Sequence, residues 1–88
     1  MKNNFVIILV TFGSKREAEL AADLLLRKRL VACASIIDKV GSKFWWNGRM
    51  DKALETLVIL KTAGNKFKAV EKEVKRLHSY EVPEIIAI

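Results

Sequence analysis

The sequence predicts an α+β fold in which strands and helices follow the order β-α-β-β-α-β. Three observations indicate this class: two segments with apolar residues at helical spacing, four apolar runs of strand-forming residues, and one Asn-Gly pair typical of a tight hairpin. The chain has 88 residues, of which 51% are apolar. This length gives room for a single domain, residues 1–88, and the apolar content excludes a disordered tail.

The first half of the chain predicts a strand followed by a helix. The run Phe5–Phe12 is expected to be a buried strand rather than a signal peptide, because no small-residue cleavage site follows it. Ser14 and Glu17 have the Ser-x-x-Glu spacing of a capping box, which predicts that a helix begins at Ser14. Apolar residues at steps of three and four extend this helix to about Arg29: Ala18, Ala21, Ala22 and Leu25.

A long hairpin is expected in the middle of the chain. Strand-type residues continue from Leu30 to Trp46, and Gly41 is expected to mark a bulge or kink midway. Asn47-Gly48 predicts a type I′ turn, because both central positions of that turn need positive φ. The returning strand is expected from about Ala53 to Thr62. The sixteen residues from Val31 to Trp46 extend about 50 Å, against a domain diameter of roughly 30 Å, so the hairpin must project or bend sharply.

The last part of the chain predicts a second helix and a final strand. Apolar residues at helical spacing run from Phe67 to about His78, and the segment Val82–Ile88 is expected to be a strand. Pro83 fits the first residues of that strand or a sheet edge. Right-handed crossovers would place both helices on the same face of a four-stranded antiparallel sheet, which is the ferredoxin-like arrangement.

Apolar residues are expected on both faces of this sheet. Successive residues of a strand point to opposite faces, yet the runs Phe5–Val10 and Leu57–Leu60 are apolar throughout. A large exposed apolar patch is unusual on a monomer and marks an interface. We therefore expect an obligate oligomer whose subunits pack sheet to sheet, with hairpins tipped by Phe44, Trp45 and Trp46 embracing neighbouring chains.

Charge and cysteine content limit the possible functions. The 16 Lys and Arg residues outnumber the 10 Asp and Glu residues, and the net charge of +6 permits an anionic partner without establishing one. The single cysteine, Cys33, excludes a disulfide framework and favours a cytoplasmic location. In an apolar strand, Cys33 is expected to be a buried small hydrophobic residue. The sequence has no phosphate-binding glycine loop, nucleophile triad or membrane span, so no enzyme, organic cofactor or membrane partner is expected.

The segment His78–Glu84 is the densest in polar functional groups. It holds an imidazole, a phenol and two carboxylates at the junction between helix and strand. A divalent metal could be coordinated through His78 together with Glu81 or Glu84. The alternative is structural: His78 ends the helix and favours its dipole, while Tyr80 packs and forms a hydrogen bond.

Two further groups could belong to a site. The aromatic residues 44–46, beside Lys43 and Arg49, could wall a ligand cleft or stack nucleobases, or they could anchor a subunit contact. Glu55 and Lys61 share a strand face about 20 Å apart, which is too far for a direct pair. Each could meet a partner from another chain at the rim of an intersubunit pocket, or could be a solvated strand end.

Taken together, these residues resemble the CutA family, the divalent-ion-tolerance proteins. The resemblance covers essentially the whole chain and rests on four motifs in order: Arg29-Leu30-Val31-Ala32-Cys33-Ala34, Ser42-x-Phe44-x-Trp46-x-Gly48, Glu55 followed by Ile59-x-Lys61-Thr62, and His78-x-Tyr80-Glu81-Val82-Pro83-Glu84-Ile85-Ile86. It implies a cytoplasmic homotrimer of ferredoxin-like subunits, similar in assembly to the PII signalling proteins. It also implies a link to tolerance of copper and other divalent cations, and no enzyme activity.

The resemblance also implies a site between subunits. The residues carried over by position to this intersubunit cleft are Trp46, Glu55, Lys61, His78 and Tyr80. Among them, His78 is the best candidate ligand for Cu(II) or Zn(II). Some members have a cysteine and a second histidine where this chain has Val10 and Leu77, so a copper site built on those positions is absent. Relatives continue beyond the position of Ile88 through a further strand and helix, and without them one flank of the hairpin would be less covered.

Other functions stay open at the level of sequence. A PII-like small-molecule signalling protein and a purely structural assembly partner would share the predicted oligomer. An RNA recognition motif has the same strand order, but it stacks bases on exposed aromatics of its central strands, and Leu57–Leu60 has none. No nucleic-acid partner is therefore expected. An acylphosphatase-like enzyme would need a phosphate-cradling loop with a catalytic arginine, which the sequence lacks.

Overall fold

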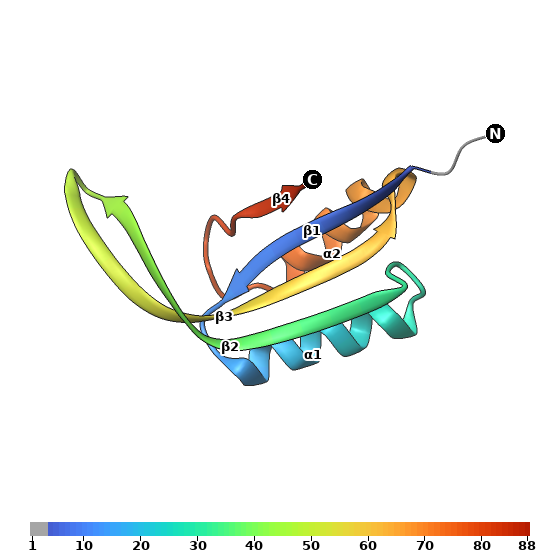
Figure 1. The fold of residues 1–88 in the computed structure, drawn as a ribbon, viewed down its shortest axis with the longest axis horizontal. Helices are drawn as coiled ribbons and strands as arrows, with labels where there is room; N and C mark the ends of the chain where they lie inside the picture. The colour runs from blue at the N-terminus through green and yellow to red at the C-terminus, as the bar shows by residue number, and fades with distance from the viewer. Residues whose placement is uncertain (1–3) are drawn as a thin grey trace.

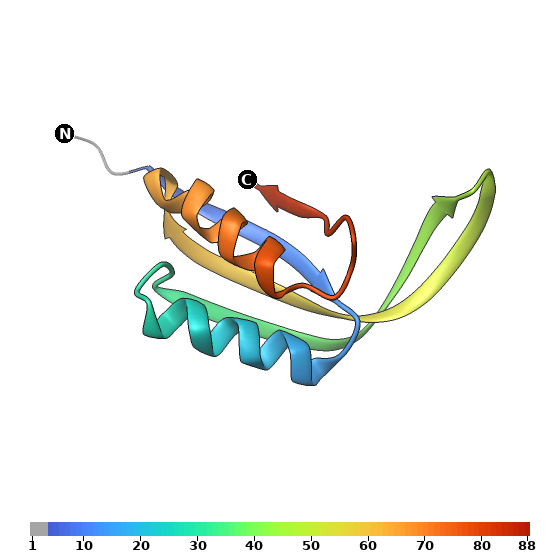
Figure 2. The same cartoon turned by 180° about the vertical axis from the view of Figure 1, so that it is seen from behind.

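A computed structural model describes residues 4–88 and has the predicted α+β order. The neighbouring strands are all antiparallel, in the order β2-β3-β1-β4, and both helices cover one face of the sheet (Figures 1 and 2). The ferredoxin-like prediction is thereby confirmed. The elements are β1 (Phe5–Phe12), α1 (Lys15–Arg27), β2 (Cys33–Trp46), β3 (Arg49–Ala63), the short 3-10 helix η1 (Gly64–Lys66), α2 (Phe67–Leu77) and β4 (Ile85–Ala87).

Helix α1 begins and ends with capping interactions. The Ser14 hydroxyl accepts a hydrogen bond from the Glu17 backbone N–H at 3.2 Å, which confirms the predicted N-terminus. At the other end, Arg29 is in the left-handed region with φ 57°, and the N–H of Leu30 bonds the carbonyl of Leu25 at 3.0 Å. This is a Schellman motif with arginine where glycine is usual. The motif turns the chain after the helix, so β2 begins at Cys33 rather than at Leu30.

The core lies between the helices and the sheet. The stripe predicted for α1 is buried, and Val70 and Val74 of α2 are fully buried. Both helices pack on alternate residues of β1 and β3, which point to the helical face. These buried strand residues are Ile8, Val10, Phe12, Val58 and Leu60.

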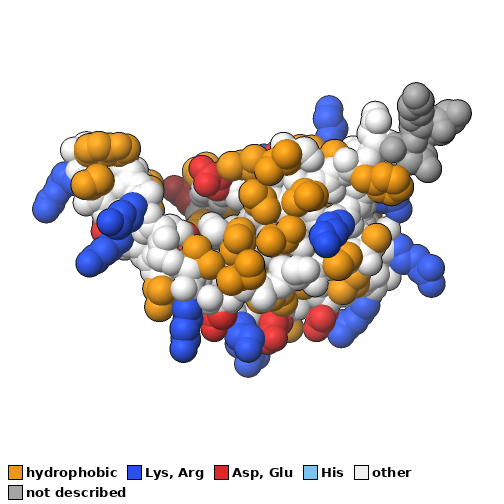
Figure 3. All heavy atoms as spheres, viewed as in Figure 1, with side chains coloured by type: hydrophobic (Ala, Val, Ile, Leu, Met, Phe, Trp, Pro, Cys, Tyr) orange, Lys and Arg blue, Asp and Glu red, His pale blue; other side chains and the backbone are white. Residues whose placement is uncertain are grey.

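The opposite side of the sheet, here called the open face, is apolar and uncovered in the single chain. It is formed by the alternate residues Phe5, Ile7, Leu9, Ile37, Leu57, Ile59 and Ile86. Phe5 is 75% exposed, and Figure 3 shows hydrophobic side chains spread over this face. The prediction of a sheet that is apolar on both faces is confirmed. Cys33 also lies on this face, opposite Lys61, so it is exposed rather than buried as predicted.

The hairpin is regular at its turn and irregular at a bulge. Asn47 and Gly48 have φ values of 52° and 75°, which confirms the predicted turn, and pairing runs up to Trp46 and Arg49. Strand β3 therefore begins at Arg49, earlier than the predicted Ala53. Residues 41–54, here called the arm, project from the rest of the chain (Figure 1). Body and arm together measure 47 × 24 × 21 Å.

The prediction of a bulge at Gly41 is wrong. Gly41 pairs regularly with Leu54, and the register shifts instead between Ile37 and Val40. Lys39 there has φ 58°, and the Asp38 carboxylate accepts hydrogen bonds from the Lys39 N–H at 2.9 Å and the Thr56 hydroxyl at 2.8 Å. These two bonds, led by that of Thr56, lower the pKa of Asp38. A short acidic side chain that bonds its neighbouring backbone thus replaces glycine as the cause of the bulge.

Strand β4 is much shorter than predicted. It spans Ile85–Ala87, although the sequence predicts a strand over Val82–Ile88. Pro83 lies before the strand, because proline has no N–H to donate to a ladder. Beyond the strand, Ile88 continues the pairing with Ile7 through backbone bonds of 3.1 and 2.8 Å.

Candidate functional site

The most connected polar group of the chain gathers around His78, where α2 ends. The His78 side chain is fully buried and stacks on Phe12, with ring centroids 4.5 Å apart and planes 13° apart. Its Nε2 lies 2.6 Å from the Thr11 carbonyl oxygen, and its Nδ1 accepts the Tyr80 backbone N–H at 3.1 Å. A carbonyl can only accept and a backbone N–H can only donate, so the ring is the neutral Nε2–H tautomer. His78 holds the helix–strand junction, as the structural alternative predicts.

Tyr80 is held between His78 and Glu55. Its ring centroid lies 4.6 Å from that of His78, and its hydroxyl donates a hydrogen bond to Glu55 Oε2 at 2.6 Å. Burial raises the pKa of Tyr80 to about 12, and the hydrogen bond and charge of Glu55 act in the same direction. The phenol is therefore a neutral donor over the physiological range. The buried Glu55 keeps its remaining acceptor capacity for another group.

Glu17 fastens the segment after α2 to the first turn of α1. Its carboxylate accepts the Ser79 backbone N–H at 2.6 Å and the Ser79 hydroxyl at 3.0 Å. Sequence reasoning assigned Glu17 to the capping box alone and missed this role. A hydroxyl directly after the helix-ending histidine is the only signal in the sequence, and it does not specify a partner 62 residues away.

The residues predicted to bind a metal do not form a site within one chain. Both ring nitrogens of His78 are already engaged, while Glu81 and Glu84 are exposed. Over residues 4–88, no three His, Cys, Asp or Glu side chains are grouped so that they could hold a metal ion. Glu81 instead borders a depression of about 360 Å³ beside the ion-paired Glu71 and Lys75. A cation does not fit His78 in this fold, because a ring nitrogen would first have to lose its hydrogen bond.

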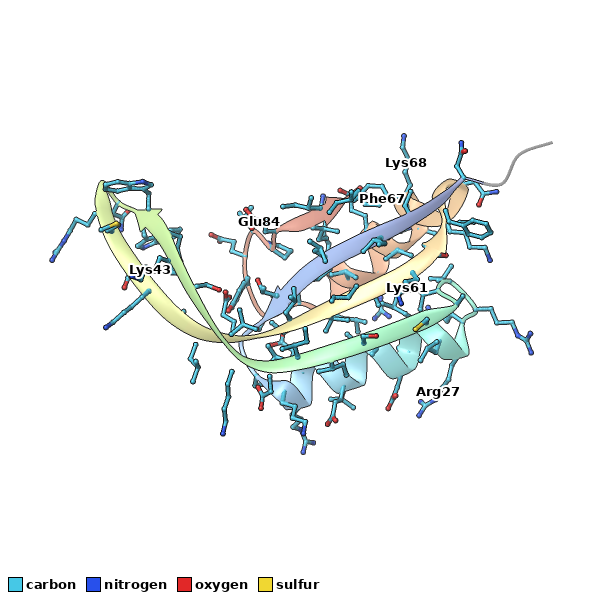
Figure 4. All side chains as sticks on the ribbon, viewed as in Figure 1. Arg27, Lys43, Lys61, Phe67, Lys68 and Glu84 are labelled. Atoms are coloured by element: carbon cyan, nitrogen blue, oxygen red, sulfur yellow. The ribbon has the colours of Figure 1, made fainter. Side chains whose placement is uncertain are left out.

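The residues predicted to line a cleft are only partly brought together. Glu55 and Tyr80 are in contact, with His78 beside them, whereas Trp46 is at the tip of the arm and Lys61 lies on the open face (Figure 4). Trp46 pairs with Arg49 and therefore points to the same face of the β2–β3 ribbon as Arg49. Arg49, Glu55 and Lys61 are separated by even numbers of positions on β3, so Trp46, Glu55 and Lys61 share one face. Glu55 lies six positions after Arg49 on β3, and Lys61 lies six positions after Glu55. Each of these two distances along the strand is about 20 Å.

The architecture defines the class of protein: a ferredoxin-like α+β chain whose central hairpin is extended into an arm. Comparison with known proteins agrees with this class. A sequence profile for the CutA1 divalent ion tolerance proteins matches residues 6–88. The chain belongs to this family.

Individual relatives are similar over nearly the whole chain. The Divalent-cation tolerance protein CutA of Archaeoglobus fulgidus is 45% identical over 86 residues, covering 98% of this chain and 81% of the relative. The solved structure of that organism's periplasmic divalent cation tolerance protein CutA has a TM-score of 0.93 at 44% identity, covering 96% of this chain and 81% of the other. Protein CutA 1, chloroplastic, of Oryza sativa is 32% identical over 83 residues. The match covers 94% of this chain and 47% of the rice protein, so this chain spans about half of that relative's length.

The helices carry no membrane-crossing character. In the part of the chain that the structure describes, neither helix is both long enough and apolar enough to cross a bilayer.

Proposed function

We propose that this chain acts as a non-enzymatic binding protein within a homotrimer, and that its ligand lies in a cleft between subunits around Glu55 and Tyr80. The observation that carries the proposal is the uncovered apolar open face. A folded chain that leaves Ile7, Ile37 and Ile86 exposed to water gains stability when another sheet covers them. Closed rotational symmetry lets each copy cover the next without leaving an unpaired surface.

The spacing along the β2–β3 ribbon supports a site shared between chains. Trp46, Glu55 and Lys61 share one face of the ribbon but are separated by steps of about 20 Å. They can surround one ligand only if they come from different subunits, and the projecting arm supplies the reach. An aromatic wall, a carboxylate and an ammonium group from separate chains would then converge on a small ligand.

The family name relates these proteins to divalent cations, and we propose that a cation such as Cu(II) or Zn(II) is taken by carboxylates at this cleft. Glu55 offers acceptor oxygens, and Glu81 and Glu84 are exposed and free to face a neighbouring chain. His78 contributes by holding Tyr80 in place rather than as a ligand. We propose a cytoplasmic location from the single unpaired thiol, although the Archaeoglobus fulgidus relative is described as periplasmic.

Light scattering with and without Cu(II), followed by calorimetric titration, tests the proposal. The expected result is a mass of three chains of 10.0 kDa and saturable cation binding that weakens in Glu55→Gln. Binding that survives Glu55→Gln but is lost in His78→Ala would restore the imidazole as the ligand. A well-behaved 10.0 kDa particle at micromolar concentration would remove both the trimer and the cleft.

A PII-like role in small-molecule signalling is the second candidate, because Lys61 places one ammonium group in the middle of the apolar open face (Figure 4). An anionic ligand would need that charge, whereas a cation would be repelled by it. Tighter cation binding in Lys61→Ala would favour the first candidate, and loss of an anionic ligand would favour the second.

A further inference from the structure

A second depression lies at the opposite end of the sheet from the Glu55–Tyr80 contact. It is bordered by Phe5, Leu26, Arg27, Arg29, Val31 and Lys66 and is here called the basic groove. At the groove end of the sheet, Phe5 of β1 pairs with Ala63 of β3. At the other end, Phe12 pairs with Thr56, which is next to Glu55. Phe12 lies seven positions after Phe5 along β1, about 23 Å, so within one chain the basic groove is separate from the Glu55–Tyr80 contact.

The basic groove is positively charged. Three of its bordering residues are cations, Arg27, Arg29 and Lys66, and among residues 4–88 no carboxylate borders it. No ion pair within residues 4–88 occupies these three side chains. Nearby Lys28 shows the contrast, because it is neutralised by Glu73 at 2.9 Å. The cations of the groove are therefore available to an external anion.

Hydrogen bonds satisfy the backbone carbonyls at the end of α1, which would otherwise repel an anion in the groove. The carbonyls at the end of α1 give that end a partial negative charge. Lys66 Nζ donates to the Arg29 carbonyl at 2.9 Å, and the Leu25 and Leu26 carbonyls are taken by the Schellman motif. Arg29, which holds the left-handed conformation that ends α1, borders the groove itself.

The groove also has an apolar wall and the size of a ligand site. Phe5, Leu26 and Val31 contribute hydrophobic surface, and Phe5 is 75% exposed and Leu26 40% exposed in the chain. The open volume is about 620 Å³, within the range of about 300–1,000 Å³ typical of small-molecule sites. Figure 4 shows Arg27 at the end of the body away from the arm.

We propose that the basic groove binds a phosphate monoester that carries a small apolar or aromatic group. A phosphate dianion presents three acceptor oxygens, which match two planar guanidinium groups and one ammonium group. The apolar body of the ligand would lie against Phe5 and Leu26, so that inorganic phosphate binds more weakly than its aryl ester.

The test uses the full chain in its native assembly, with phenyl phosphate and inorganic phosphate as calorimetric probes at low ionic strength. Arg29→Gly removes one cation and suits the left-handed backbone at that position, so the variant is expected to fold. Lys72→Gln removes the same charge from the exposed surface of α2 and is the matched control. Backbone amide shifts of Val31 and Ala32 report whether the probe is in the groove.

We expect saturable binding of phenyl phosphate that weakens about five- to tenfold in Arg29→Gly and is unchanged in Lys72→Gln. Added salt should weaken it further, because the contacts are at the surface. Absence of binding to the wild-type chain, or equal losses in the two variants, overturns the proposal. Equal affinity for inorganic phosphate overturns the role of the apolar wall, and amide shifts confined to the Tyr80 region assign the anion to the other site.

Discussion

Replacement of Tyr80 by phenylalanine isolates the hydrogen bond at the centre of the candidate site. The substitution keeps the ring that packs on His78 and removes the hydroxyl that donates to Glu55 at 2.6 Å. A hydrogen bond to a charged acceptor contributes about 1.5–3 kcal/mol, and Glu55 would be left buried without this donor. We expect Tyr80→Phe to lower the free energy of unfolding by that amount per chain at neutral pH.

The same contact predicts a characteristic pH dependence. The pKa of Tyr80 is raised from 10.0 to about 12 in the folded chain. The stability that this bond contributes is therefore fully present below pH 10 and is lost as pH rises through about 12. The difference between the wild-type chain and Tyr80→Phe should shrink across that interval, while the titration of lysines cancels between the two.

Denaturant unfolding at equal chain concentration measures this difference, because association also affects stability. Tyr80 is the only tyrosine, so phenolate absorbance reports its titration alone and the variant provides the blank. Glu55→Gln is the matched control, since it keeps an acceptor but removes the charge and should bring the midpoint back toward 10.0. Equal stability of the two chains at pH 7, or a difference that does not change up to pH 12, would refute the reasoning.

Three other outcomes test separate parts of the structure. Arg29→Gly should raise the free energy of unfolding by about 0.5–1 kcal/mol, because glycine accepts φ 57° without strain; an unchanged or lower value in thermal unfolding would contradict the Schellman assignment. Asp38→Ala should reduce the acid sensitivity of the fold, as acid titration followed by circular dichroism can show. The pKa of Asp38 is lowered by its hydrogen bonds, so its stabilising contribution is present above pH 3.8 and disappears as pH falls through the lower folded value. Ile59→Lys should break the oligomer by placing a charge in the middle of the open face, whereas Leu20→Lys, on the exposed side of α1, should leave the mass unchanged in light scattering.

Most of the fold could be predicted because its signals are local. The capping residue Ser14, the apolar stripe after it and the Asn47-Gly48 turn each act over a few residues, and all three occupy the predicted places. The misplaced bulge depends on a distant contact, because Asp38 bonds Thr56, which is 18 residues away. The length of β4 was misjudged for a local reason, because Pro83 has no N–H to donate to the ladder beside β1.

The sequence named several residues of the polar cluster around His78, but it did not indicate which contacts they form. His78 and Tyr80 of the predicted His78–Glu84 segment lie in one polar cluster, and the contact of Glu55 with Tyr80 brings two of the predicted residues together. The engagement of both His78 nitrogens could not be foreseen, because Thr11 is 67 residues away and contributes only a backbone oxygen. The role of Glu17 was hidden for the same reason, since its carboxylate serves Ser79 from another element.

The position of Cys33 gives the molecule an internal reporter. It is the only thiol in the chain, and it lies uncovered on the sheet surface that we assign to subunit contact. A maleimide would then alkylate dissociated copies quickly and assembled copies slowly. The labelling rate would count free protomers in a mixture without an added tag, and it would follow their exchange between complexes in real time.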